Sequence, residues 1–300
     1  MKKTTRLKQL ILDPKVLIMP GAYDALSARI IERAGFQAVQ ASGYGIAASY
    51  LGLPDVGLLT MSEMLDQTRR IARAVDIPVM GDGDTGFGNA INVYRTVREF
   101  EAAGVAGINL EDQVFPKRCG HMEGKEIIPL EEMIKKIEAA LEARRDPDFI
   151  INARTDAIAM AGVEEAIRRG NAYAQAGADL IFVEAPRSLE EIRRVVQEIK
   201  APVSINMLDD GKTPLIPVGE LEKMGVARVS FPLTALFAAA FALREAMEYL
   251  REHRLMTGYA ARLFKFGEFT DLVGLPKIRD LETRFLPEGT IAAKYGGWRT

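Results

Sequence analysis

The chain has 300 residues, of which 48% are hydrophobic and 27% are charged, and its formal net charge is -2. This composition is typical of a soluble globular chain, and the balanced charge lacks the basic surface that nucleic acid or an anionic membrane would require. The single cysteine, Cys119, excludes an internal disulfide and fits a cytoplasmic setting. We expect no signal peptide and no membrane span, because no apolar run is long enough.

Short β-rich runs alternate along the chain with amphipathic stretches of helical period. In chain order the runs are Val16–Met19, Ala38–Ala41, Pro78–Gly81, Gly107–Leu110, Phe149–Ala153, Leu180–Val183, Pro202–Ile205 and Arg228–Phe231. Four are preceded by glycines that we interpret as helix ends: Gly35, Gly104, Gly177 and Gly225. Because no run is rich in charge or proline, as an edge strand is, the pattern predicts a closed (β/α)8 TIM-type barrel within the α/β class.

The end of the chain is predicted to be helical. An eighth barrel helix is expected at roughly Thr234 to His253, which assigns residues 1–254 to a catalytic barrel. Residues 255–300, which include the lone tryptophan, Trp298, form a C-terminal helical extension that is too small to be a domain. We expect this extension to pack on the barrel or on a neighbouring subunit.

Acidic residues are concentrated where the predicted strands end, which is where a barrel builds its active site. The six carboxylates are those of Asp82, Asp84, Glu111, Asp112, Asp156 and Glu184. Carboxylates this close together would repel one another unless a cation lay among them. With only two histidines and one cysteine in the chain, the ligands would be oxygen atoms, which favours Mg²⁺ with Mn²⁺ as a substitute.

Cys119 lies in the segment Lys117-Arg118-Cys119-Gly120-His121. A thiol beside two cations and an imidazole is in an environment that lowers its pKa and suits proton transfer or nucleophilic chemistry. The alternative for this segment alone is an incidental surface loop.

A second segment, Gly81 to Gly86, matches the G-x-G-x-x-G pattern of dinucleotide-binding loops, with Glu111 at about the distance of a ribose-binding acid. Asp82 and Asp84 would then place negative charge against a pyrophosphate. The glycines are better interpreted as small residues that let two metal-binding aspartates and a ligand approach the backbone.

Five motifs in order resemble the isocitrate lyase/phosphoenolpyruvate mutase superfamily over about residues 10–250. They are Ser42-Gly43-Tyr44, Gly81 to Gly88, Glu111-Asp112-Gln113, Lys117 to His121, and Asn152 to Asp156. The resemblance implies a (β/α)8 barrel whose last helix is swapped between subunits, usually in a homotetramer built as a dimer of dimers. It also implies Mg²⁺ and an α-oxyacid or α-keto acid in the site.

The resemblance further implies a role for individual residues. The metal carboxylates would be Asp82 and Asp84, with Asp55 and Glu111 acting mostly through metal-bound waters. The residues implied to bind or orient substrate and thiol are Ser42, Gly43, Tyr44, Gly120, His121, Arg154, Glu184 and Asn206.

Within this set, Arg154 would bind the carbonyl or alkoxide oxygen, and Cys119 would be the proton donor on a mobile gating loop. The general base stays open between Tyr44 and a metal-bound water. A turn or helix-cap role for Asp55 and a salt-bridged strand end for Glu184 are the structural alternatives.

Departures from the family pattern indicate the subclass. Phosphonomutases that resemble this fold carry no thiol in the gating loop, so Cys119 favours carbon–carbon cleavage. Phe237 and Phe266 stand where methylisocitrate lyases use arginines for their tricarboxylate, which implies a smaller dicarboxylate with an apolar branch. The whole pattern most resembles 2,3-dimethylmalate lyases and petal-death-type enzymes, often labelled carboxyvinyl-carboxyphosphonate phosphorylmutase.

The function implied is Mg²⁺-dependent cleavage of a 2-hydroxy dicarboxylate, such as 2,3-dimethylmalate, into pyruvate and propionate. The partner expected is therefore a small di- or tricarboxylate. Methylisocitrate lyase, oxaloacetate hydrolase or decarboxylase, and phosphonomutase activities stay as alternatives.

Overall fold

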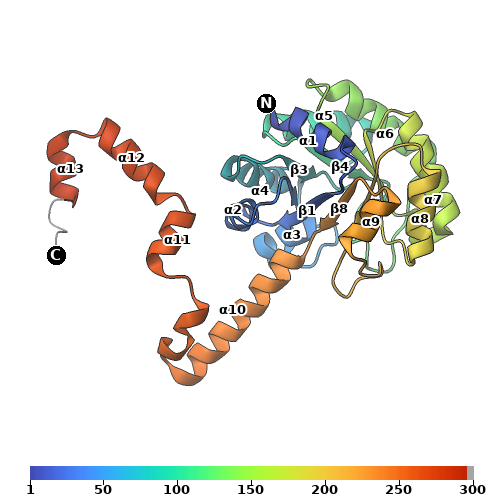
Figure 1. Cartoon of the computed structure of the whole chain (residues 1–300). Helices are drawn as coiled ribbons and strands as arrows, with labels where there is room; N and C mark the ends of the chain where they lie inside the picture. Colours follow the sequence, from blue (N-terminus) through green and yellow to red (C-terminus); the bar gives the residue numbers. More distant parts are fainter. Residues whose placement is uncertain (296–300) are drawn as a thin grey trace. The chain divides into compact units, whose positions relative to one another are not determined.

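Eight parallel strands close into a barrel, with β1 (Leu17–Ala22) paired to both β2 (Val39–Ala41) and β8 (Arg228–Phe231) (Figure 1). The others are β3 (Val79–Asp82), β4 (Gly107–Glu111), β5 (Ile150–Thr155), β6 (Leu180–Val183) and β7 (Val203–Asn206). This computed structural model describes residues 1–295, so Trp298 lies outside the described residues. Every predicted strand and the predicted TIM-type barrel are confirmed.

Helices between successive strands cover the outside of the barrel, and one further helix precedes β1 and another follows β8 (Figure 1). They are α1 (Lys3–Leu12), α2 (Ala25–Arg33), α3 (Gly43–Leu51), α4 (Met61–Ala74), α5 (Ala90–Ala102), α6 (Leu130–Ala143), α7 (Ala157–Gln175), α8 (Leu189–Glu198), α9 (Val218–Met224) and α10 (Thr234–His253). The glycines predicted to end helices are Gly35, Gly104, Gly177 and Gly225. All four have a positive φ, the left-handed backbone conformation in which an α-helix commonly ends. These helix ends are therefore confirmed.

The apolar core has two parts. The larger one lies between the strands and the surrounding helices, where residues such as Phe100, Phe149 and Tyr173 are fully buried. The smaller one joins Leu7 and Ile11 of α1 to the first residues of several strands. Helix α1 thus closes the amino end of the barrel, and the carboxyl end is left for the site.

The barrel interior also holds a buried arginine. Arg228 of β8 is completely buried, and its guanidinium donates hydrogen bonds to Gln40 Oε1 and Ser230 Oγ, both at 2.6 Å. Burial lowers the pKa of Arg228 to about 9, although Asp82 and Glu184 counteract this shift, so the group stays charged at neutral pH. The acidic rim therefore has a cation beneath it.

Asp112 anchors a buried polar network behind the barrel. Its carboxylate accepts hydrogen bonds from Thr155 Oγ1 (2.8 Å), the Asp156 amide (2.9 Å), Arg169 Nη1 (3.0 Å) and Tyr173 OH (2.7 Å). The network ties the end of β5 to helix α7. Asp112 therefore does not face the cavity, and the predicted convergence of six carboxylates on one rim is wrong for this residue.

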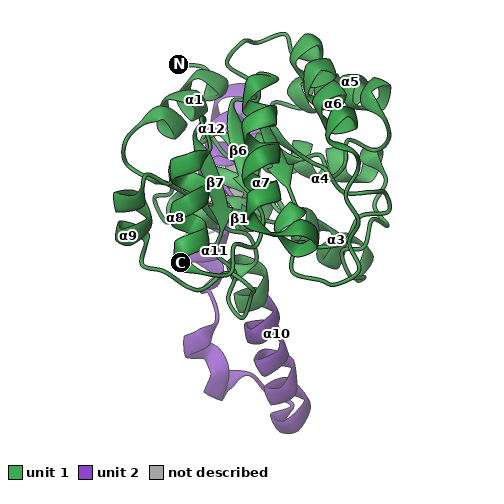
Figure 2. Cartoon of the chain, turned by 90° about the vertical axis from the view of Figure 1, so that its right-hand side faces the viewer, with its two compact units in different colours: residues 1–239 green, residues 240–300 purple. Residues whose placement is uncertain are grey.

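Residues from Ala240 onward form a second unit, coloured separately in Figure 2, whereas the first unit comprises Met1–Ala239. The second unit contains the rest of α10 and then η1 (Thr257–Arg262), α11 (Phe266–Leu272), α12 (Leu275–Phe285) and α13 (Glu288–Tyr295). The predicted helix Thr234–His253 is confirmed. The chain divides inside this helix, whereas we predicted the boundary after residue 254.

The C-terminal helices that we expected are present. Helix swapping and the homotetramer stay predictions. Among the described residues, no helix is both long and apolar enough to cross a membrane.

We predict that Asp112→Asn lowers the free energy of unfolding by about 3 kcal/mol, because it removes the buried carboxylate that accepts from Thr155, Arg169 and Tyr173 and leaves Arg169 with Glu165 as its remaining acidic partner. Urea denaturation followed by circular dichroism measures this change.

Glu198→Gln is the matched control, because it removes a carboxylate from the exposed ion pair with Arg194 on α8. It should change stability by less than about 1 kcal/mol. Equal effects of the two substitutions would contradict the importance that we assign to the Asp112 network.

Candidate active site

A cavity in the first unit opens among the carboxyl ends of the strands. Its lining includes Ser42, Gly43, Tyr44, Asp55, Asp82, Cys119, Gly120, His121, Arg154, Glu184 and Asn206, all of which were predicted as site residues. It also includes residues that were assigned no role: Gln40, Asn109, Lys117, Phe182, Leu208, Pro232 and Leu233. The structure therefore brings most of the predicted site together.

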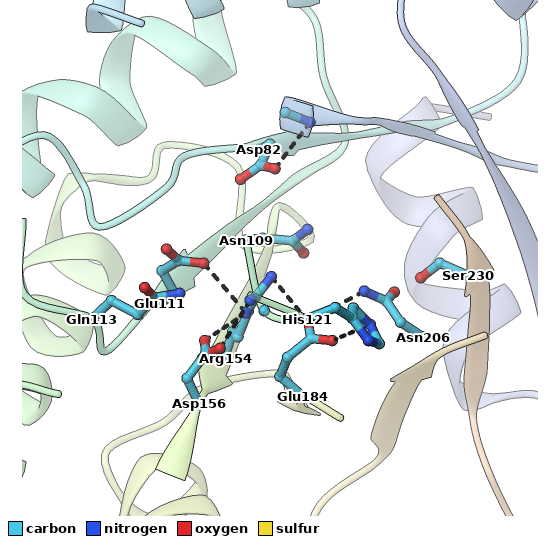
Figure 3. Close-up of polar contacts among 12 residues, drawn as sticks. Asp82, Asn109, Glu111, Gln113, His121, Arg154, Asp156, Glu184, Asn206 and Ser230 are labelled. Atoms are coloured by element: carbon cyan, nitrogen blue, oxygen red, sulfur yellow. Dashed lines mark hydrogen bonds and ion pairs between the residues drawn. The ribbon is translucent and has the colours of Figure 1, made fainter. Parts of the chain in front are cut away.

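Arg154, near the end of β5, lies among three carboxylates (Figure 3). Its Nε is 2.8 Å from Asp156 Oδ2 and 3.3 Å from Glu111 Oε2, and its Nη1 is 3.0 Å from Glu184 Oε2. The guanidinium also stacks on the Phe182 ring, 5.1 Å from its centroid. These contacts fix the position of Arg154 at the cavity wall.

Lys117 is a second buried cation of the rim. Its ammonium lies 2.7 Å from the Asp55 carboxylate and 2.8 Å from Asp84 Oδ1. Although burial disfavours the charged lysine, the carboxylates of Asp84 and Asp55 raise its pKa well above the usual value. Lys117 therefore offsets part of the negative charge at the ends of β3 and β4.

The loop after β2 positions Asp82. The Gly43 amide at the start of α3 donates to Asp82 Oδ2 at 3.1 Å, and a Cβ at position 43 would overlap that carboxylate. Ser42 caps α3 by accepting from the Gly45 amide. The glycine and the positive end of the helix together stabilise a negative charge on Asp82.

The segment from Lys117 to Lys125 carries the thiol and contributes Lys117, Cys119, Gly120 and His121 to the cavity lining. Its start is fixed by Gln113, whose side chain accepts from the Arg118 amide (2.9 Å) and donates to the Arg118 carbonyl (2.8 Å). The Cys119 amide donates to the Asp55 carbonyl at 3.1 Å. Cys119 is therefore held close to the acidic rim.

The electrostatics of Cys119 differ from our prediction. Burial raises the pKa of the thiol to about 11, and Asp55 and Glu184 add to this effect more than Arg154 opposes it. The two cations beside it in the sequence do not help, because Lys117 is paired with Asp55 and Asp84, and Arg118 is exposed. The predicted lowering of the pKa is wrong, and Cys119 is a protonated thiol at neutral pH.

Each ring nitrogen of His121 lies near a polar group that orients the ring. Its Nδ1 accepts from the Lys212 amide at 3.0 Å, so the proton of the neutral ring is on Nε2, which lies 3.2 Å from Glu184 Oε1. Asn206 Nδ2 donates to Glu184 Oε2 at 3.3 Å (Figure 3). Burial disfavours the Glu184 carboxylate, but Arg154 and His121 lower its pKa, so Glu184 is an anion.

Tyr44 also lines the cavity. Burial raises the pKa of its phenol, and Cys119 and Asp55 add to this effect. Tyr44 is therefore protonated at neutral pH and can donate a hydrogen bond to a substrate carboxylate.

The remaining carboxylates suit a hard cation. Burial raises the pKa of Asp84 to about 7, with Lys117 opposing and Asp82 adding to the effect, and Glu111 has one buried oxygen with no hydrogen-bond partner among the described residues. In residues 1–295 no group of three or more acidic, histidine or cysteine side chains could hold a metal by itself. A cation that keeps several waters and takes one or two carboxylates, as Mg²⁺ does, fits this donor set.

Three predicted site residues do not line the cavity. Asp84 and Glu111 are buried beside it. Phe237 lies one helical turn beyond Leu233, and 42% of its surface is exposed. Its contact with substrate stays a prediction, and Phe266 belongs to the second unit.

The residues that we missed share a simple signal. Gln40 and Asn109 are polar residues inside otherwise apolar strands, and such residues in a barrel face its interior. The apolar residues Leu208 and Leu233 are each the second residue after a strand, β7 and β8 respectively, which also places them at the rim. Their positions relative to the strands could have identified them.

The chain was compared with known families and proteins. A family model described as phosphoenolpyruvate phosphomutase matches residues 7–251. The 2,3-dimethylmalate lyase of Eubacterium barkeri is 47% identical over 285 residues, covering 95% of this chain and 99% of that protein. The 2-methylisocitrate lyase of Aeropyrum pernix is 46% identical over 268 residues, covering 89% of this chain and 86% of that protein.

Solved structures agree with this result. A crystal structure of 2,3-dimethylmalate lyase, described as a PEP mutase/isocitrate lyase superfamily member, has a TM-score of 0.92 and 34% identity, covering 100% of this chain and 99% of that one. Phosphonopyruvate hydrolase with oxalate and Mg²⁺ has a TM-score of 0.88 and 35% identity, covering 96% and 100%. The family predicted from the five motifs is confirmed.

We predict that Cys119 alkylates slowly at neutral pH. With a pKa of about 11, only about one thiol in a thousand is ionised at pH 8, and the rate should rise about tenfold for each pH unit up to about pH 10. Because the chain has one cysteine, mass spectrometry after iodoacetamide treatment in EDTA measures this rate directly. N-acetylcysteine is the reference, and a protein rate that levels off below pH 9 would show that the thiol is not shielded.

Proposed function

Because the chain belongs to the phosphoenolpyruvate phosphomutase family, we propose that it cleaves a carbon–carbon bond in a 2-hydroxy dicarboxylate with an alkyl branch. The substrate class includes 2,3-dimethylmalate, whose cleavage gives pyruvate and propionate, with Mg²⁺ as cofactor. The observation that carries the proposal is the composition of the cavity, which combines Arg154, a protonated thiol and an apolar wall.

The apolar wall consists of Leu208, Pro232 and Leu233, at the ends of β7 and β8. Leu208 and Leu233 are both buried, at 8% and 3% exposure. Among the described lining residues, the lysine and arginine cations are Lys117 and Arg154, and both are already paired with carboxylates. An alkyl branch fits this wall, whereas a third carboxylate would be buried there without a partner.

The chemistry follows from the protonation states. The hydroxyl proton passes to solvent water, which also reprotonates Cys119 at the end of the cycle. The bond between C2 and C3 then breaks, so that C2 becomes a carbonyl and C3 takes the electron pair. Arg154 binds the oxygen on C2 throughout this change. Cys119 then gives its proton to C3, and its high pKa keeps the proton on sulfur until the carbanion forms.

The residues of the acidic rim would hold the metal. Asp55 and Asp82 line the cavity, and Asp84 and Glu111 are buried. Asp82 and Asp84 would bind the metal, and Asp55 and Glu111 would act mostly through water. When bound, Mg²⁺ supplies positive charge that stabilises the oxyanions of the substrate.

His121 and Asn206 orient Glu184, which in turn contacts Arg154. This chain of contacts links the thiol segment to the residue that binds the reacting oxygen. The same arrangement disfavours phosphonomutase activity, because phosphoryl migration requires no proton donor of this kind.

We predict that kcat/KM for 2,3-dimethylmalate exceeds that for methylisocitrate by at least about a hundredfold. The reason is that an unpaired buried carboxylate costs about 3 kcal/mol, and each 1.4 kcal/mol is about tenfold in rate. Both substrates would release pyruvate, so lactate dehydrogenase and NADH measure both reactions in one assay.

Leu233→Arg should narrow this difference, because it supplies a cation at the apolar wall. Leu189→Arg on α8, where the side chain is 37% exposed, is the matched control and should leave the ratio unchanged. EDTA should remove turnover, and added Mg²⁺ should restore it. Equal cleavage of both substrates by the wild-type enzyme would contradict the proposed substrate class.

A further inference from the structure

Lys125 is a buried lysine with no role in the chemistry above. It follows the Cys119–His121 segment by a few residues, and only 4% of it is exposed. Its ammonium donates to the Gly120 carbonyl and, at 2.9 Å, to Asp156 Oδ1. A buried ammonium costs free energy unless its partners are well placed, so these two contacts decide where the lysine lies.

The Gly120 carbonyl belongs to the part of the segment that packs closely against the cavity wall. A Cβ at position 120 would overlap the Glu184 side chain and lie 2.6 Å from Arg154 Nη2. The backbone between Cys119 and His121 therefore rests directly on Arg154 and Glu184. Movement of Gly120 away from this wall would remove its contact with both neighbours.

Asp156 is a firm anchor for the lysine. Its two carboxylate oxygens accept from Arg154 Nε at 2.8 Å and from Arg154 Nη2 at 3.1 Å. Its amide donates to Asp112 at 2.9 Å, within the buried network behind β5. One carboxylate thus binds both Arg154 and the lysine of the thiol segment.

We propose that Lys125 is a positioning residue that holds the Cys119–Gly120–His121 segment closed over the cavity. It does so by joining the Gly120 carbonyl to Asp156, so that the thiol and Arg154 share one anchor. The inference rests on the proposed function only in taking Cys119 as the proton donor. Opening the segment would break the contact with Asp156 and expose the thiol.

The test is the alkylation rate of Cys119 in Lys125→Met. At pH 7.5 in EDTA, iodoacetamide should modify the variant at least about tenfold faster than the wild type, because a lost hydrogen bond to a charged group is enough for such a shift. The kcat for 2,3-dimethylmalate should fall more than its KM rises. A merely structural role would lower the melting temperature without changing the alkylation of the folded protein.

Control variants distinguish the loss of Lys125 and its contacts from the loss of any lysine. Lys135→Met removes an exposed lysine that pairs with Glu138 on α6, and it should alkylate at the wild-type rate. Lys125→Arg retains the charge and should recover part of the slow alkylation. If Lys125→Met does not fold, Lys125→Gln loses the charge opposite Asp156 and keeps a donor for Gly120.

The outcomes are distinct from those of the substrate test. Alkylation requires no substrate, so its rate tests the role of Lys125 even if the protein shows no lyase activity. A wild-type alkylation rate in folded Lys125→Met, or in Lys125→Gln if the methionine variant does not fold, would overturn the proposal. If Cys119 is alkylated faster in every variant, including Lys135→Met, the proposal is overturned as well, because the effect then does not depend on the contacts of Lys125.

Discussion

Carboxylates buried at the carboxyl ends of β3 to β6 set the constraint on which the rest of the site depends. Ionised carboxylates out of water require positive charge nearby, and here Lys117 and Arg154 each contact more than one of them. Both cations are therefore already paired with carboxylates before a substrate binds. The dicarboxylate that we propose as substrate would need further positive charge. Burial raises the pKa of Asp84 to about 7 and Asp82 adds to the effect, so a metal bound at the rim would favour the ionised form of Asp84.

Burial and the same carboxylates determine the role of the thiol. In a positive, exposed environment Cys119 would be a thiolate and a nucleophile, but burial and, to a smaller extent, Asp55 and Glu184 raise its pKa and keep its proton on sulfur. A protonated thiol is of use at the step in which a carbanion must be quenched. Lys125 and Arg154 both donate to Asp156. In our proposal this shared partner holds the thiol segment and Arg154 in a fixed relation.

The barrel could be predicted from the sequence because each β-run is bounded by residues that end a helix or turn the chain. The site residues were predictable where they follow a strand, as Asp82 and Glu184 do. Asp112 was misplaced because neighbouring residues of a strand point to opposite faces, so Glu111 faces the site and Asp112 faces α7. The pKa of Cys119 was misjudged because Lys117 turns towards partners distant in the sequence, which no local pattern shows.

The most direct test of the proposed chemistry is cleavage of 2,3-dimethylmalate in D₂O with Mg²⁺. If the leaving fragment is protonated at carbon by Cys119, whose thiol proton exchanges with solvent, each propionate should carry one deuterium at C2, and the pyruvate methyl group should carry none. Proton NMR and mass spectrometry of the products measure both. Deuterium in the pyruvate methyl group, or pyruvate release without propionate, would contradict the account.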